Sequence, residues 1–322
     1  MTFDQLAPIL RAVQRAAALC QRVQQEEAAT TLTKGDKSPV TVADFGSQAL
    51  ICHGLAEAFG GAVHVIGEEQ SESLRRDPDG PLARRIATYV AEQMPSLTPS
   101  DVWDAIDIGG KRTYADDFWT LDPIDGTKGF LRNEQYAIAL AHLKDGKVDA
   151  AILGCPNLLA PDGATGCIIV ATDALGLYWT STNRSTALLP MAPSATPALR
   201  FCESVESAHS DQSASVQIAT TLGITAPPIR MDSQAKYATV ARGDASVYLR
   251  LPTRPGYVEK IWDHAAGSRI VEAAGGTVTD MYGSPLDFTQ GAGLEKNKGV
   301  IATQGIDHAR VIEAIGETIQ SA

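Results

Sequence analysis

Residues 121–130 hold the clearest chemical signal in this chain of 322 residues. Asp122 and Asp125 place two carboxylates three positions apart, at the end of an apolar stretch with high β-propensity. Pro123 restricts the backbone between them, and Gly126 permits a sharp turn directly afterwards. The spacing therefore allows both carboxylates to face one pocket.

The same segment offers further oxygen and hydrogen-bond donors. The carbonyl oxygen of Ile124 can join the two carboxylates, and such hard oxygen donors suit Mg²⁺. Thr127 adds a hydroxyl and a backbone N–H, which suit a phosphate group. Taken alone, the segment is also typical of an ordinary Asp-Pro turn whose second aspartate caps a helix.

Three other segments carry acids in suggestive positions. Glu68 and Glu69 follow a predicted strand, and Asp44 stands at the start of a predicted helix. Asp263 lies in the segment 262–267, which opens a predicted helix of small residues. A solvated acidic turn or a helix cap explains each of them separately. Their joint occurrence with the central motif favours a shared site that functional groups at strand and helix ends would form.

The first half of the chain must position three of these segments. Apolar spacing predicts helices over Phe3–Glu27 and Asp44–Phe59, and a short strand over Ala62–Ile66. The polar segment Thr30–Val40 predicts a mobile loop, and the weak periodicity of Pro95–Thr113 predicts irregular structure.

After the central motif, the sequence pattern changes from long helices to strands and then to alternating strands and helices. Four β-like runs follow the central motif, and Asp145-Gly146 predicts a hairpin between the first two. Thr180–Pro197 is rich in Ser, Thr, Ala and Pro and predicts a linker. We therefore expect an α+β domain over residues 1–182, carrying most of the acids. An α/β domain over residues 198–322, where short strands alternate with helices, would carry Asp263.

Composition limits the classes of partner. The net charge of −11 argues against a nucleic-acid polymer, which requires a basic surface, but it allows a small phosphorylated substrate. No apolar run approaches a membrane span, and the N-terminus has no secretory signal pattern. Five scattered cysteines are typical of buried thiols in a reducing compartment. We expect a monomer in the cytoplasm, or in an organelle if a transit peptide has been removed.

Three motifs together resemble the signatures of a known superfamily. Gly67-Glu68-Glu69, residues 121–127 and residues 262–267 are similar, in order and separation, to those of the lithium-sensitive, Mg²⁺-dependent phosphatases of the inositol monophosphatase superfamily. The resemblance covers essentially the whole chain. It implies a layered αβαβα sandwich of the sugar-phosphatase type, which combines α+β and α/β character.

Further strings resemble one branch, the 3′(2′),5′-bisphosphate nucleotidases, and most of all its plant and fungal salt-tolerance enzymes. The strings lie at residues 38–44, 125–132, 204–210, 232–237 and 248–252. This resemblance implies hydrolysis of 3′-phosphoadenosine 5′-phosphate to AMP and phosphate, with the sulfated nucleotide as a further substrate. The alternative is an inositol polyphosphate 1-phosphatase or inositol monophosphatase. A catalytically inactive bisphosphate sensor is disfavoured because the expected acids are all present.

The resemblance also implies two to three Mg²⁺ ions per active site and inhibition by Li⁺. Glu68, Asp122 and the Ile124 carbonyl would hold one ion. Asp122, Asp125 and Asp263 would hold a second, and a third, weaker ion would share Glu68.

The remaining roles concern the reaction and the substrate. Asp44 and Thr127 would orient and deprotonate the attacking water. The residues implied to bind substrate are Thr127, His209, Ser233, Lys236, Arg250 and Asp263. As isolated residues, Lys236 is more typical of a solvated helix charge and His209 of a loop histidine or cap, whereas the matched strings favour ligand binding.

Overall fold

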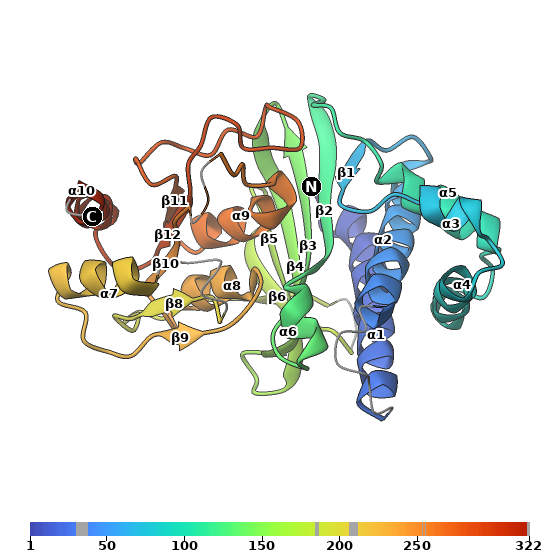
Figure 1. Ribbon diagram of the computed structural model, residues 1–322, viewed down its shortest axis with the longest axis horizontal. Helices are drawn as coiled ribbons and strands as arrows, with labels where there is room; N and C mark the ends of the chain where they lie inside the picture. Colours follow the sequence, from blue (N-terminus) through green and yellow to red (C-terminus); the bar gives the residue numbers. More distant parts are fainter. Residues whose placement is uncertain (30–37, 184–186, 206–211, 253, 255, 321–322) are drawn as a thin grey trace.

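The structure is a computed structural model that describes residues 1–29, 38–183, 187–205, 212–252, 254 and 256–320. Helices and sheets alternate in five layers, as predicted (Figure 1). Two long helices, α1 (Phe3–Ala29) and α2 (Ser38–Phe59), cover one face of a large sheet. Their apolar side chains and those of the sheet form the first core.

The large sheet has seven strands in the order β1 to β7, so neighbours in sequence are neighbours in space. Only β1 and β2 pair in parallel within it, and each later strand pairs antiparallel with the one before. Asp145 and Gly146 both have positive φ, which confirms the predicted hairpin. The strands are β1 (Val65–Gly67), β2 (Asp117–Asp125), β3 (Ala137–Lys144), β4 (Lys147–Leu159), β5 (Thr165–Thr172), β6 (Gly176–Ser181) and β7 (Leu189–Pro190).

The second sheet has five strands in the order β11-β12-β10-β8-β9. Within it β10 pairs in parallel with β8 and antiparallel with β12. This mixed sheet agrees with the alternation of short strands and helices in the sequence. The strands are β8 (Phe201–Glu203), β9 (Ile229–Arg230), β10 (Val247–Arg250), β11 (Thr277–Thr279) and β12 (Val300–Thr303).

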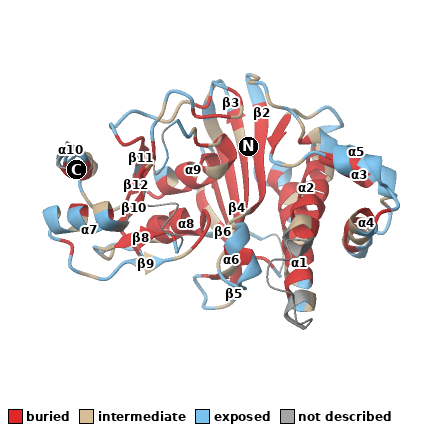
Figure 2. Cartoon of the chain, in the orientation of Figure 1, coloured by how far each residue is buried: buried red, intermediate tan, exposed pale blue. Residues whose placement is uncertain are grey.

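Two helices fill the space between the sheets, α8 (Ala235–Arg242) and α9 (Ala265–Ala273). A short 3₁₀ turn, η2 (Ile261–Asp263), leads into α9. On the far face of the second sheet lie α7 (Gln212–Thr221) and α10 (His308–Gln320). Figure 2 shows the consequence: α8 and α9 are almost wholly buried, whereas α7 and α10 expose their outer faces.

Three helices lie beside the first layer: α3 (Glu72–Arg76), α4 (Pro81–Gln93) and α5 (Pro99–Ile108). The last corrects our prediction of irregular structure over Pro95–Thr113. Thr98 and Asp101 form a capping box in front of α5, and Pro99 occupies its first turn. The local start signals outweigh the weak apolar periodicity.

A second correction concerns the predicted loop Thr30–Val40. Its last three residues, 38–40, belong to α2, and residues 30–37 lie outside the described part. The predicted linker Thr180–Pro197 contains the end of β6 and all of β7, and the second sheet begins after it. The division into domains at residues 182 and 198 stays a prediction.

Candidate functional site

The end of β2 brings two acids to the centre of the molecule. The pairing of β2 with β3 shifts register between Asp122 and Asp125, so the strand bulges where the acids lie. The Ile124 N–H donates to Asp122 Oδ1 at 3.0 Å, which fixes the orientation of that carboxylate. Gly126 has φ +85°, and a Cβ there would lie 2.8 Å from Ser233 Cβ. Glycine is therefore required where the turn meets the second half of the chain.

The parallel pairing of β1 with β2 brings a second acidic segment alongside. Gly67 pairs with Leu121, so Glu68 follows its strand at the level of Asp122. The carboxyl groups of Glu68 and Asp122 interact directly, and each alters the pKa of the other. Arg112 Nη2 donates to the Glu68 carbonyl oxygen at 3.1 Å and holds the segment in place.

Asp44 lies inside α2 rather than at its start, so the helix-cap explanation does not apply. The side chain is buried, and its Oδ1 atom has no hydrogen-bond partner among the described residues. Burial, followed by the charges of Glu69 and Glu68, raises the pKa of Asp44 well above its ordinary value. A buried carboxylate oxygen with no hydrogen-bond partner, beside other acids, is unfavourable in itself, so the surroundings of Asp44 fit a cation or a water molecule.

The second half of the chain supplies Asp263 at the end of η2, directly before α9. Burial, followed by the charge of Asp125, raises the pKa of Asp263 well above its ordinary value. Arg250, at the end of β10, places its Nη2 atom 4.0 Å from Asp263 Oδ2. The acids of both sheets therefore meet at one place.

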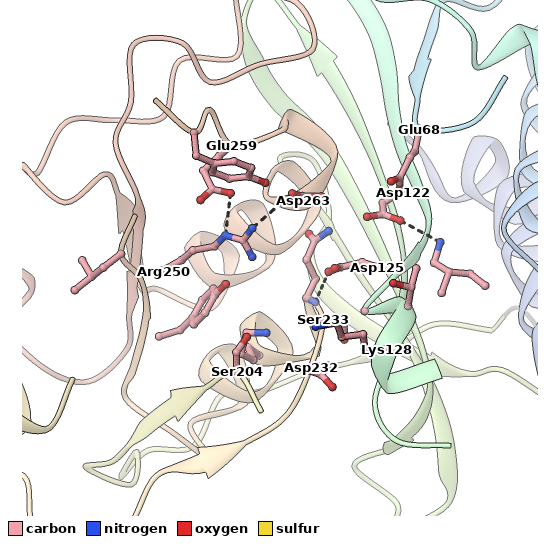
Figure 3. Close-up of a pocket in the computed structure, with 18 of the residues that line it drawn as sticks. Glu68, Asp122, Asp125, Lys128, Ser204, Asp232, Ser233, Arg250, Glu259 and Asp263 are labelled. Atoms are coloured by element: carbon pink, nitrogen blue, oxygen red, sulfur yellow. Dashed lines mark hydrogen bonds and ion pairs between the residues drawn. The ribbon is translucent and has the colours of Figure 1, made fainter. Parts of the chain in front are cut away.

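A pocket of about 390 Å³ lies at this meeting point. Figure 3 shows the acids of the first half facing Asp263 and Arg250 of the second across it. Nine of the predicted site residues line it: Glu68, Asp122, Ile124, Asp125, Thr127, Ser233, Lys236, Arg250 and Asp263. Asp44 is not among the lining residues but interacts electrostatically with Glu68 and Asp122. His209 lies outside the described residues.

The acids of this pocket fit divalent cations. Burial and then the charge of Glu68 raise the pKa of Asp122 well above its ordinary value. Burial, with Glu69 and Asp125, raises the pKa of Glu68 to about 7. Like charges in one site oppose each other's ionisation, positive charge among them relieves this, and every carboxylate donor is a hard oxygen, as Mg²⁺ prefers.

The raised pKa of Glu68 predicts a pH-dependent instability of the metal-free protein. An acid whose pKa is raised by folding binds more protons in the folded state, so its contribution to stability falls as the pH rises from about 4.5 to about 7. We expect Glu68→Gln to raise the melting temperature in EDTA, more at pH 7.5 than at pH 5. Although many atoms surround Glu68, the residue is exposed to solvent, so the effect should be modest.

The difference in melting temperature between the variant and the wild type at each pH removes the contribution of other titrating groups. These include His264 and His308, whose lowered pKa values make stability rise with pH. Thermal scans in EDTA and in excess Mg²⁺ provide the measurement. A difference between variant and wild type that stays constant from pH 5 to pH 7.5 would contradict the electrostatic account.

The wall opposite the acids is cationic. Lys236 is 3% exposed, with Nζ 5.2 Å from the Tyr248 ring and 3.4 Å from the Met231 carbonyl oxygen. Burial lowers the pKa of Lys236. Arg250 Nε donates to Glu259 Oε2 at 2.8 Å. A buried lysine and a fixed arginine at the pocket wall suit an anionic group that binds away from the acids.

Sequence reasoning missed several residues of this site. Glu259 accepts from both Arg250 and His264, and Tyr257 and Arg254 line the pocket. Glu259, Asp263 and His264 bring one ligand atom each within 4.8 Å of one another. The two hydrogen bonds already occupy Glu259 Oε2, so this group is an ion-pair network. The one sequence signal for Glu259 is its position four residues before Asp263.

Comparison with known proteins agrees with this architecture. Residues 4–320 match the sequence profile described as the inositol monophosphatase family. The chain belongs to this family, whose members are in general Mg²⁺-dependent. Among curated relatives, proteins named 3′(2′),5′-bisphosphate nucleotidase from Schizosaccharomyces pombe and Emericella nidulans are 43% and 41% identical to it. The alignments cover 98% and 96% of this chain, respectively, and 96% of each relative.

Solved structures support the fold. The Thermotoga maritima IMPase superposes with a TM-score of 0.61 at 16% identity, covering 97% of this chain and 96% of the other. CysQ from Bacteroides thetaiotaomicron, described as a bacterial member of the inositol monophosphatase family, superposes with a TM-score of 0.58 at 17% identity, covering 93% of this chain and 97% of the other. Within the described ranges, no helix has the length and apolar character needed to cross a membrane.

Proposed function

We propose that this protein is a Mg²⁺-dependent phosphatase that removes the 3′-phosphate of 3′-phosphoadenosine 5′-phosphate and leaves AMP. One observation carries the proposal: a single pocket joins an acid cluster to a wall formed by Lys236 and Arg250. Such a pocket suits a substrate with one phosphate that reacts and a second that does not. The names of the two curated relatives from Schizosaccharomyces pombe and Emericella nidulans agree with this substrate.

Two or three Mg²⁺ ions would be held by the residues inferred from the sequence, namely Glu68, Asp122, the Ile124 carbonyl, Asp125 and Asp263. When bound, the ions supply positive charge to the reacting phosphate and make a water acidic enough to attack it near neutral pH. The raised pKa values of the acids support this assignment, because bound cations would allow these groups to ionise.

The protein's own groups would handle the proton and the phosphate. Asp44 would accept a proton from the attacking water, either directly or through the Thr127 hydroxyl. Thr127 begins the short helix α6 (Thr127–Leu131) and is exposed to the pocket. Its hydroxyl can therefore reach a bound phosphate. The free Oδ1 atom of Asp44 is consistent with an acceptor role.

The rest of the substrate would lie along the second half of the chain. Lys236 and Arg250 would bind the phosphate or base that does not react, together with Ser233 and His209. Inhibition by Li⁺, hydrolysis of the sulfated nucleotide and a monomeric state belong to the same proposal.

Steady-state phosphate release tests the proposal. The substrates are 3′-phosphoadenosine 5′-phosphate, its sulfated analogue, inositol 1-phosphate and inositol 1,4-bisphosphate, each with and without Mg²⁺. We expect the first to give the highest kcat/KM and turnover to require Mg²⁺. A higher kcat/KM for an inositol phosphate would favour the inositol phosphatase alternative. Binding of the nucleotide without turnover would favour a sensor.

The cationic wall predicts that removing Lys236 or Arg250 lowers kcat/KM mainly for substrates with a second phosphate. Lys236→Met and Arg250→Met keep the apolar stems but remove charged hydrogen bonds, each worth about 1.5–3 kcal/mol. This corresponds to roughly a 10- to 100-fold lower kcat/KM for 3′-phosphoadenosine 5′-phosphate. Inositol 1-phosphate, which has no second phosphate, should lose much less.

Arg310→Met is the matched control for Arg250, because Arg310 lies on α10 and its recorded ion pairs are with Glu313 and Glu317. It should not alter either substrate. If Lys236→Met and Arg250→Met lower kcat/KM equally for both substrates, Lys236 and Arg250 support the electrostatic field of the pocket or the fold. The argument for a nucleotide substrate would then be lost.

A further inference from the structure

Gln234, the residue directly before α8, joins three parts of the site. It is 1% exposed. Its backbone N–H donates to Asp125 Oδ2, its side-chain Nε2 donates to the Trp262 carbonyl oxygen at 2.8 Å, and its Oε1 accepts from the Gly267 N–H at 3.0 Å. Asp125 stands 109 positions earlier in the chain. Both ends of one buried amide are therefore fixed, and the backbone holds an acid from the other sheet.

The two residues that the Gln234 side chain contacts, Trp262 and Gly267, lie on either side of Asp263 in the sequence. Trp262 comes directly before it, and Gly267 lies in the first turn of α9, where backbone N–H groups have no partner within the helix. Gln234 therefore serves as a distant cap for α9 and also holds the backbone that precedes Asp263. The carboxylates of Asp125 and Asp263 come from different sheets, and Gln234 contacts the structure around each of them.

The surroundings leave Gln234 little freedom. Ser233 has φ +69°, and its Oγ accepts from the Ala235 N–H at 3.1 Å, so the chain turns sharply just before α8. Asp232 forms an ion pair with Arg132, which follows α6. At Gly267 a Cβ would lie 2.1 Å from the Tyr237 ring, so α8 and α9 are in close contact there. A shift of Gln234 would therefore disturb both helices.

We propose that Gln234 is a positioning residue that sets the separation of Asp125 and Asp263, and through it the affinity of the site for Mg²⁺. The inference rests on the proposed function. Mg²⁺ requires near-ideal octahedral geometry with short metal–oxygen distances, so small errors in ligand spacing weaken binding. Partners that orient metal ligands typically change metal affinity or activity by about 10- to 100-fold when mutated.

Two variants and one matched control separate this role from general support of the fold. Gln234→Met keeps the length of the side chain but removes its donor and acceptor. Gln234→Asn keeps the amide on a side chain that is too short to span both partners. Gln304→Met is the control, because Gln304 Nε2 donates to the Ala274 carbonyl oxygen at 2.9 Å, at the opposite end of α9.

The first readout is Mg²⁺ binding without substrate, measured as the Mg²⁺ concentration that gives half of the maximal rise in melting temperature. The second is the Mg²⁺ concentration for half-maximal phosphate release from 3′-phosphoadenosine 5′-phosphate. We expect both to rise about tenfold or more in the two Gln234 variants. In Gln304→Met they should stay at the wild-type values, although the melting temperature in EDTA falls.

A lower melting temperature in EDTA with unchanged Mg²⁺ concentrations in both readouts would overturn the inference and leave Gln234 with a structural role alone. Failure of the proposed function has a different signature, because the wild type itself would then release no phosphate from this substrate.

Discussion

Replacing Asp122 with asparagine is expected to reduce phosphate release by about three orders of magnitude or more at saturating Mg²⁺. Asp122 is proposed to bridge two ions, so its loss weakens a charge-stabilising effect worth several kcal/mol, and each 1.36 kcal/mol is a factor of ten in rate. The stability of the metal-free protein, in contrast, should stay the same or rise. Burial and neighbouring acids raise the pKa of Asp122, so a neutral side chain there relieves repulsion in the metal-free protein.

The measurement is kcat/KM over a Mg²⁺ series, together with the melting temperature in EDTA at pH 7.5. We expect a large loss of activity and an equal or higher melting temperature. Asp117→Asn is a suitable control, since Asp117 begins the same strand but is exposed, and it should leave the Mg²⁺ dependence unchanged. Substantial activity of Asp122→Asn at high Mg²⁺ would contradict the metal assignment.

The second large effect is expected at Asp44. Asp44→Asn keeps the size of the side chain but removes a proton acceptor, and general acid–base groups typically contribute about 10²–10⁴-fold to rate. We expect kcat to fall within this range while KM for the nucleotide changes little, because Asp44 does not line the pocket. Single-turnover kinetics at saturating Mg²⁺ would measure the chemical step directly.

Thr127→Ala provides the comparison. If the Thr127 hydroxyl passes the proton to Asp44, both variants lower kcat, and the double variant loses little more than either single one. Additive losses would mean that the two residues act separately. An unchanged kcat in Asp44→Asn would show that its burial among acids has no catalytic purpose.

The acids that line the pocket could be predicted because their signals are local. Asp122 and Asp125 stand beside a proline and a glycine that shape the turn, and Glu68 and Asp263 stand at element ends. The layered fold followed from the resemblance and is confirmed. The helix α5 has start signals in Thr98 and Asp101, but its apolar periodicity is too weak to predict a helix by itself.

Long-range contacts could not be predicted from the sequence. Ser38-Pro39 is a possible helix-start signal, but the β-branched residues Val40–Val42 that follow it disfavour a helix, so the sequence did not indicate that α2 begins at Ser38 and contains Asp44. The link from Gln234 to Asp125 depends on how two sheets pack against each other. The double use of Glu259 by Arg250 and His264 depends on the same packing. Such contacts join residues whose separation along the chain carries no pattern.

The central claim is that the acid cluster acts on the 3′-phosphate while the cationic wall holds the rest of the nucleotide. Chromatographic identification of the product from 3′-phosphoadenosine 5′-phosphate, incubated with the wild type and Mg²⁺, tests this most directly. The account predicts AMP and phosphate in equal amounts, with no product when EDTA replaces Mg²⁺. Formation of adenosine 3′-phosphate, or no turnover of the nucleotide by an enzyme that hydrolyses inositol phosphates, would contradict it.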